Sequence, residues 1–370
     1  MGVVLSKKKL TSFQIIIIGF SSVILLGTLL LMLPISSRTG EFTSFADALF
    51  TSTSAVCVTG LIVFDTATYW SLFGQFVIML LIEIGGMGVI TVAASFAMIA
   101  GRKISLMQRS TMQEAIAAPK VGGIVRLTIF VIKATLMIEL LGAVAMSPVF
   151  CRDFGIKGLW MALFHSVSAF CNAGFDLMGV KSPFSSLTFY ADEPLINFPI
   201  MLLIIIGGIG FLTWDDIRAN RFHIHKYRMQ SKVIISTTAI LILVPALYFY
   251  FFEFSDLGLK ERIFSSLFQS VTPRTAGFNT VDLTSMSEAG QFITIILMLI
   301  GGSPGSTAGG MKTTTIAVLF AIAIATFRRR EDANFFGRRI NGDVLKNAAT
   351  VFLMYLSLIH ISEPTRRSYI

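Results

Sequence analysis

The feature that most constrains this chain is a series of apolar runs long enough to cross a lipid bilayer. A bilayer core requires about 20 consecutive apolar residues. Five runs meet or approach this length, at residues 14–33, 72–99, 124–146, 197–214 and 233–252. With 54% hydrophobic and 14% charged residues, the chain has too little polar surface for a soluble globule of its size. The first run is longer than the apolar part of a secretory signal, so we expect it to stay as a span.

The basic residues are segregated along the chain, and they predict its orientation. They cluster after every second span, at Arg102, Lys103, Arg109, Lys120 and Arg126, at Arg218, Arg221, Lys226, Arg228 and Lys232, and at Arg328, Arg329, Arg330, Arg338, Arg339 and Lys346. The positive-inside rule places these loops and the N-terminus in the cytoplasm. The net charge of +9 does not indicate nucleic-acid binding, because no cluster of aromatic and basic residues accompanies it.

Two short patterns each recur three times, the first between spans and the second within the helices that return to the cytoplasm. The first runs through residues 49–60, 163–175 and 267–278, and each copy is too short to span. We expect each copy to enter the membrane from outside as a short helix and to return as extended backbone. The second pattern ends in paired glycines at residues 81–86, 203–208 and 297–302, for which we expect mainly close helix packing. The predicted fold is an all-α polytopic membrane protein with three complete helix, pore-loop, helix repeats.

The first pattern has a physical reason to handle ions. Irregular backbone is tolerated at membrane depth only where protein buries it or where it lines a wet cavity. A potassium ion needs oxygens that replace its hydration shell, and glycine permits the backbone angles that direct carbonyl oxygens to one axis. A single copy could equally be a hairpin that only packs. Three copies in equivalent positions favour a cation pathway lined by backbone carbonyls.

Three strings then carry a resemblance to a known family. They are TSAVCVTGL at residues 53–61, TPRTAGFNT at 272–280 and GGSPGSTAGGMK at 301–312. They resemble the Trk/Ktr/HKT superfamily of potassium transporters, and most closely the membrane subunit of bacterial Ktr systems. The resemblance covers the chain from the first span to about Leu356. It implies a multi-pass protein of the bacterial plasma membrane whose substrate is potassium, with sodium left open as a second ion. It also implies that the three repeats and the start of a fourth surround a pseudo-fourfold pore.

The resemblance also implies which residues form the selectivity filter. The matching positions are Val58, Thr59 and Gly60, Asn172, Ala173 and Gly174, and Thr275, Ala276 and Gly277. In that family a serine at the first of the three glycines accompanies sodium preference, so Gly60 favours potassium.

A glycine-rich segment is expected to form a gate. In Ktr proteins the matching segment is an intramembrane loop under the filter, and here it comprises Gly301, Gly302, Ser303, Pro304, Gly305, Ser306, Thr307, Ala308, Gly309, Gly310, Met311 and Lys312. Its glycines and proline cannot hold a regular helix, so it breaks the third returning helix. A static kink is the alternative. A phosphate-binding loop is disfavoured because Met311 separates Gly310 from the lysine.

The predicted units are residues 1–100, 101–220, 221–330 with the broken gate helix, and 331–356 as the start of a fourth repeat. Residues 357–370 resemble a non-native tail, which suggests a truncated gene. The resemblance further implies a homodimer in the lipid bilayer and a cytoplasmic ring of nucleotide-binding regulatory subunits, with no covalently bound cofactor. The alternatives are a non-conducting membrane scaffold or an inactive fragment. A carrier with inverted repeats is disfavoured because all three units share one orientation.

The remaining polar residues of the spans give no catalytic pattern. Glu83 and Glu139 lie deep in their spans and either attract cations or are satisfied by neighbouring backbone. Cys57, Cys151 and Cys171 show no metal-ligand spacing, so the sequence predicts no transition-metal site. Without a nucleophile and base or a pair of catalytic carboxylates, an enzyme is not expected.

Overall fold

The first helix shows how the chain starts and stops its long helices. The structure is a computed structural model that describes residues 11–99, 104–116, 118, 120, 122–221, 223–330 and 332–362. Helix α1 (Ser12–Met32) begins with a capping box, in which Thr11 and Gln14 each accept a hydrogen bond from the other's backbone N–H. It ends at Leu33, which is extended because Pro34 follows. Of the predicted basic residues, Arg102 and Lys103 lie outside the described residues.

The elements recur in one order: a long helix, a short helix, an irregular loop and a returning pair of helices. The first unit comprises α1, α2 (Phe45–Cys57), α3 (Leu72–Met87) and α4 (Val89–Ile99). The second comprises α6 (Ile124–Phe154), α7 (Lys157–Phe170), α8 (Pro194–Gly208) and α9 (Phe211–Asn220). The third comprises α10 (Met229–Tyr248), a π-helical turn (Phe249–Glu253), α11 (Leu259–Val271), α12 (Glu288–Leu299) and α13 (Thr313–Phe327).

The other elements connect or follow these units. Helix α5 (Leu106–Ile116) lies between the first and second units, and a small antiparallel hairpin of β1 (Asn334–Phe335) and β2 (Arg338–Arg339) follows the third. Single 3-10 turns occur at Pro34–Ser36, Met178–Val180, Thr188–Tyr190, Ile224–Lys226 and Leu283–Ser285. The last helix, α14 (Gly342–Ser362), runs past the predicted unit boundary at residue 356, and residues 363–370 of the predicted tail lie outside the described part.

Three helices of the described chain are individually long and apolar enough to cross a membrane, namely α1, α6 and α10 with its π-helical turn. Helices α8 and α9 meet the same criterion only as a pair, which is bent by 97° and makes a fourth crossing if it forms one span. The returning helices are therefore interrupted in all three units, whereas the sequence predicted a break only in the third. The reason is a left-handed glycine in each of the first two, Gly88 with φ 83° and Gly210 with φ 90°.

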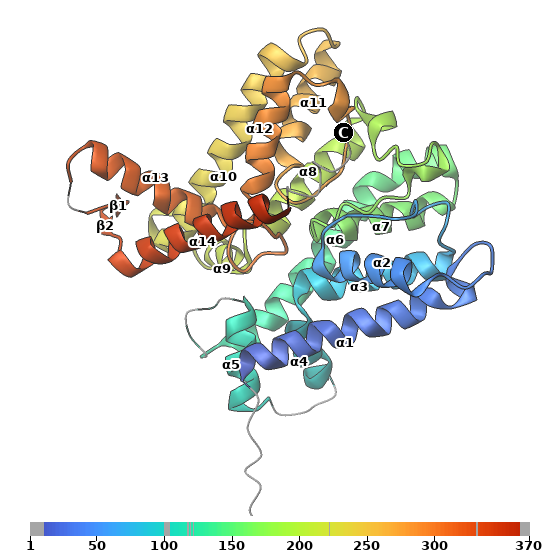
Figure 1. The fold of residues 1–370 in the computed structure, drawn as a ribbon, viewed down its shortest axis with the longest axis horizontal. Coiled ribbons are helices and arrows are strands. Elements are labelled where there is room, and N and C mark those ends of the chain that lie inside the picture. Colours follow the sequence, from blue (N-terminus) through green and yellow to red (C-terminus); the bar gives the residue numbers. More distant parts are fainter. Residues whose placement is uncertain are drawn as a thin grey trace, which may run out of the picture.

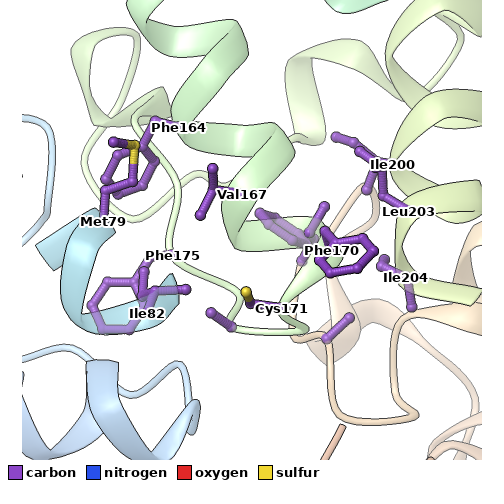
Figure 2. Packing of buried hydrophobic residues seen from close by; sticks show 14 of the residues in the cluster. Met79, Ile82, Phe164, Val167, Phe170, Cys171, Phe175, Ile200, Leu203 and Ile204 are labelled. Carbon is purple, nitrogen blue, oxygen red and sulfur yellow. The ribbon is translucent and has the colours of Figure 1, made fainter. Parts of the chain in front are cut away.

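Helix α7 lies at the centre of the main core. Figure 1 shows α1, α2 and α3 side by side below α7, with α8 on the path to the third unit. In Figure 2, Phe164, Val167 and Phe170 of α7 lie between Met79 and Ile82 of α3 and Ile200, Leu203 and Ile204 of α8. Large apolar side chains on α1, α6 and α10 instead remain exposed, among them Leu25, Leu140 and Leu243. Such apolar outer faces suit contact with lipid.

Candidate functional site

The three predicted filter stretches share one unusual backbone pattern. In each, the first and third residues have positive φ: Val58 (56°) and Gly60 (73°), Asn172 (59°) and Gly174 (72°), and Thr275 (77°) and Gly277 (82°). A left-handed conformation costs a non-glycine residue roughly 1–2 kcal/mol, and the β-branched Val58 and Thr275 resist it most. Strain repeated at three equivalent places indicates that the surrounding structure holds these loops in a required shape.

Each stretch is fastened to the short helix that precedes it. The middle residues donate their N–H groups to that helix: Thr59 to the Ser54 carbonyl (2.9 Å), Ala173 to Ser168 (2.8 Å) and Ala276 to Thr272 (3.0 Å). The hydroxyl groups of Ser168 and Thr272 donate to the carbonyls of Phe175 (2.7 Å) and Phe278 (2.6 Å), just beyond the glycines. No hydrogen bond within the described part of the chain ends on a carbonyl oxygen of the nine filter residues. These oxygens are free to bind a ligand.

The three stretches lie next to one another in chain order. A Cβ atom added to Gly60 would lie 2.6 Å from the carbonyl oxygen of Ala173, and one added to Gly174 would overlap the carbonyl oxygen of Ala276. At Gly277 the nearest group to such an atom is Gly174, at 3.8 Å. The glycines therefore allow adjacent stretches to approach closely, and any larger residue would push them apart.

The paired glycines bring the returning helices against the ends of the short helices. A Cβ atom at Gly85 would overlap the carbonyl oxygen of Val56, and one at Gly207 would overlap that of Phe170. This agrees with the packing role expected from the sequence. The third pair differs, because Gly301 packs against Gly309 within its own loop.

The glycine-rich loop between α12 and α13 folds back on itself and lies against α8. Gly301 donates its N–H to the Met311 carbonyl (2.9 Å), and Gly302 donates to Gly309 (3.2 Å). Two further N–H groups reach the end of α8, from Ser303 to the Gly208 carbonyl (2.9 Å) and from Thr307 to Gly207 (3.2 Å). The loop thus joins the third unit to the second.

Two residues of this loop reach the filter. Asn172 donates from Nδ2 to Thr307 Oγ1 (2.9 Å), and Thr307 Oγ1 donates to the Phe170 carbonyl (2.9 Å). A Cβ atom on Gly310 would lie 3.4 Å from Cγ2 of Thr275. The structure therefore brings the predicted gate against the first residues of the second and third filter stretches.

The rest of the predicted gate has other contacts. Gly305 accepts a hydrogen bond from the Phe211 N–H at the start of α9 (2.7 Å). Ser303 shares a hydrogen bond with Thr313 (2.9 Å), and Ser306 donates to the Ser303 carbonyl (2.6 Å). Lys312 Nζ donates to the carbonyls of Ala308 (2.8 Å) and Gly309 (3.4 Å). The lysine thus binds carbonyls of its own loop.

An acidic residue lies just beyond the second filter stretch, in the loop that follows it. The pKa of Asp176 is raised to about 6, chiefly by burial and also by the neighbouring Asp65, while a hydrogen bond from the Met178 N–H (2.8 Å) opposes the change. Asp65 accepts hydrogen bonds from Ala67 (3.1 Å), Thr68 (2.9 Å) and Phe184 (3.1 Å). No pattern in the sequence indicates that these two acidic residues lie close together.

One cluster was missed by sequence reasoning. Glu83 of α3, Glu139 of α6 and Cys171 at the end of α7 present ligand atoms that all lie within 4.8 Å of one another. The residues come from three separate segments, so no spacing in the sequence could reveal the group. The available signal was the presence of single glutamates inside apolar runs.

Comparison with known proteins places this chain in a family. The model of the TrkH family, described as cation transport protein, matches residues 6–362. The potassium/sodium uptake protein NtpJ of Enterococcus hirae is 44% identical over 359 residues, which cover 95% of this chain and 78% of that protein. The Ktr system potassium uptake protein B of Bacillus subtilis is 38% identical over 360 residues, which cover 95% of this chain and 79% of that protein.

A solved structure shows the same fold. The crystal structure of the potassium transporter TrkH from Vibrio parahaemolyticus superimposes with a TM-score of 0.71 at 21% identity, and the match covers 96% of this chain and 72% of that one. With the family match along nearly the whole chain and the apolar helices described above, the chain belongs to the TrkH family of cation transport proteins, which are multi-pass membrane transporters and not enzymes.

Proposed function

We propose that this chain carries potassium ions across the cell membrane through a filter lined by the carbonyl oxygens of residues 58–60, 172–174 and 275–277. The three units, residues 1–100, 101–220 and 221–330, are placed around one pseudo-fourfold axis, and residues 331–356 begin a fourth. Two relatives with 44% and 38% identity are named for potassium uptake, which supports this ion as the substrate. The name of one of those relatives also includes sodium, so sodium is the second ion whose uptake should be measured.

The observation that carries this proposal is the repeated left-handed backbone of the filter stretches. Their middle N–H groups are occupied by the short helices, while their carbonyl oxygens accept no hydrogen bond from the described chain. Oxygens in this state can replace the hydration shell of potassium. A scaffold that only packs would have no need for three strained loops with free carbonyls.

We assign gating to residues 301–312. The loop contacts two filter stretches through Thr307 and Gly310, and hydrogen bonds hold it to the end of α8. A loop held by a few polar contacts, rather than by a packed helix, can move at modest cost.

We also propose a homodimer and a cytoplasmic ring of nucleotide-binding regulatory subunits as partners. The basic side of the protein offers a docking surface for the ring. A cavity of about 380 Å³ there is lined by Lys120, Arg126, Arg218 and Arg228, and by Asp215, which pairs with Arg228, so positive charge is in excess. Such a surface would attract an acidic partner.

The test is potassium uptake by a bacterial strain without potassium-uptake systems of its own, which expresses this chain or its Gly60→Ser variant. Gly60 has φ 73°, and a side chain there would lie 2.6 Å from the Ala173 carbonyl. We expect potassium uptake by the variant to fall by about tenfold or more, and its preference for potassium over sodium to be lost. The side chain adds about 1–2 kcal/mol of backbone strain and also displaces the Ala173 carbonyl.

Gly40→Ser is the matched control. Gly40 has the same φ of 73° but no atom within 4 Å of an added Cβ, and it is exposed in the loop between α1 and α2. This variant carries similar strain and should transport normally. Equal uptake and equal sodium discrimination in the wild type and Gly60→Ser would refute the filter assignment, and no uptake by the wild type would favour the scaffold.

A further inference from the structure

Two glutamates and a cysteine meet directly behind the second filter stretch. Glu83 lies on α3, Glu139 on α6, and Cys171 is the residue before Asn172, the first residue of that stretch. Glu139 is only 3% exposed, Cys171 is fully buried and Glu83 is partly exposed. Figure 2 shows Cys171 at the turn that leaves α7, below Phe170. The group belongs to none of the carbonyl positions assigned above.

The protein leaves part of this group unsatisfied, although the side chains of Glu83 and Glu139 contact each other. The Cys171 thiol donates weakly to Glu83 Oε2 at 3.5 Å. The other oxygen of Glu83 and Oε1 of Glu139 are buried and accept no hydrogen bond within the described chain. An unsatisfied buried carboxylate oxygen is costly, so a proton or a ligand that supplies positive charge would complete the group.

No basic side chain supplies that charge. Within the described residues, neither Glu83 nor Glu139 has a lysine, arginine or histidine nitrogen within 4.0 Å. Two carboxylates removed from water without a counter-charge repel each other strongly. They must therefore be neutralised by protons or by a bound cation.

The donor set favours one class of cation. Carboxylates alone suit sodium, magnesium and calcium, whereas a thiolate sulphur selects softer ions such as zinc. A zinc ion bound at about 2.0–2.3 Å holds its ligand atoms roughly 3.5 Å apart, so ligand atoms already within 4.8 Å need only a small adjustment. We propose that Glu83, Glu139 and Cys171 bind a zinc-class divalent cation behind the filter.

The position of the site predicts what binding would do. A Cβ atom on Gly86 would lie 2.6 Å from the Cys171 sulphur, so this side chain is confined between α3 and the filter. A metal bond to the sulphur would pull on the residue next to Asn172, whose left-handed backbone sets the second filter stretch. The proposal therefore goes beyond the transport function and makes the site a place where a divalent cation slows transport.

Cadmium binding to the purified full chain tests the proposal without any transport measurement. All work uses a Cys57→Ser/Cys151→Ser background, so that Cys171 is the one remaining thiol. The readout is the ultraviolet charge-transfer band of the cadmium–thiolate bond, titrated in detergent, followed by competition with zinc. We expect saturable binding of one cadmium ion per chain that zinc displaces.

Three single variants in that background assign the ligands. Cys171→Ser should abolish the band, and Glu139→Gln and Glu83→Gln should each weaken cadmium binding by about tenfold or more while keeping side-chain shape. Elution volume and the thermal unfolding midpoint identify any variant that fails to fold, and the two glutamine variants support each other if one does. Glu114→Gln, a change of an exposed glutamate on α5, is the control that should leave binding unchanged.

The outcomes separate this proposal from the proposed function. No band in the Cys171-only protein, or equal cadmium affinity in the glutamine variants, would overturn the metal site and leave two carboxyl groups that share protons. Cadmium should also reduce potassium uptake in the Cys171-only protein and not in its Cys171→Ser form. If the protein binds cadmium but shows no potassium uptake even when no cadmium is added, the transport proposal is contradicted and the metal site is not.

Discussion

At the scale of single residues, the most informative position of each proposed filter stretch is the one that lies two residues before the glycine. Sequence comparison among the three copies predicted the glycines, because glycine readily adopts positive φ. It could not predict that Val58, Asn172 and Thr275 share that conformation, since valine and threonine resist it. Hydrogen bonds to the preceding helix and contacts with neighbouring stretches impose it, and such contacts are not visible in a local pattern.

Asp176 gives a prediction at the same scale. Its folded-state pKa of about 6 lies above the ordinary 3.8, so the folded protein binds more protons than the unfolded chain between about pH 4 and 6. Stability contributed by this group is therefore present at low pH and is lost as pH rises through that window. The difference corresponds to roughly 3 kcal/mol.

We expect Asp176→Asn to raise the thermal unfolding midpoint at pH 7.5 and to have little effect at pH 4, because asparagine does not ionise. The measurement is thermal unfolding of the purified protein at a series of pH values, compared as the difference between variant and wild type. Asp256→Asn, at an exposed position of another outer loop, serves as the control. A difference that does not change with pH would contradict the assignment to Asp176.

At the scale of elements, the sequence predicted the helices more successfully than their interruptions. The apolar runs at 72–99 and 197–214 continue without a polar gap, so composition favours single spans. The structure breaks both at a left-handed glycine, Gly88 and Gly210. Each break follows a glycine pair that packs against the end of a short helix, so the geometry of the filter determines where the helix must end.

Adjacent glycines at the end of α8 should respond differently to one methyl group. A Cβ atom on Gly207 would overlap the Phe170 carbonyl and lie 2.8 Å from Thr307 Oγ1, whereas one on Gly208 meets nothing closer than 3.9 Å. Gly207→Ala should therefore cost about 1–3 kcal/mol of stability through overpacking. Gly208→Ala should be neutral or slightly stabilising.

Yield of folded protein, thermal unfolding and potassium uptake of the two alanine variants provide the comparison. We expect Gly207→Ala to be lower than wild type in all three and Gly208→Ala to match it. If both variants behaved alike, the role of Gly207 would not be to let α8 approach α7 closely.

At the scale of the whole molecule, the repeats and the basic loops are readable along the chain, and they led to the three units and their orientation, which stay predictions. The contact between units could not be predicted. Asn172 and Thr307 are 135 residues apart, and only the folded chain shows that a predicted filter residue donates to a predicted gate residue. The buried group of Glu83, Glu139 and Cys171 was unpredictable for the same reason.

Thr307→Val tests this connection between the units. Valine keeps the shape of threonine but removes the hydroxyl group, so Asn172 loses one acceptor and the Phe170 carbonyl loses one donor. This loss costs about 1–3 kcal/mol in the state with the loop docked. We expect faster potassium uptake, by about fivefold or more, because the loop leaves the filter more often.

Thr307→Ser keeps the hydroxyl group and should restore wild-type uptake. Initial rates at equal amounts of protein in the membrane provide the comparison. Equal rates for valine, serine and threonine at this position would show that the contact does not control transport.

The short helices α2, α7 and α11 have one further consequence. All three end at the filter, within four residues of Val58, Asn172 and Thr275 respectively. A helix dipole places roughly half a negative elementary charge at its C-terminus. The three helix ends lie beside the three proposed filter stretches. We therefore expect this place to be electrically negative without any ionised side chain among its nine residues, and its attraction for a cation should persist when the outside solution becomes acidic.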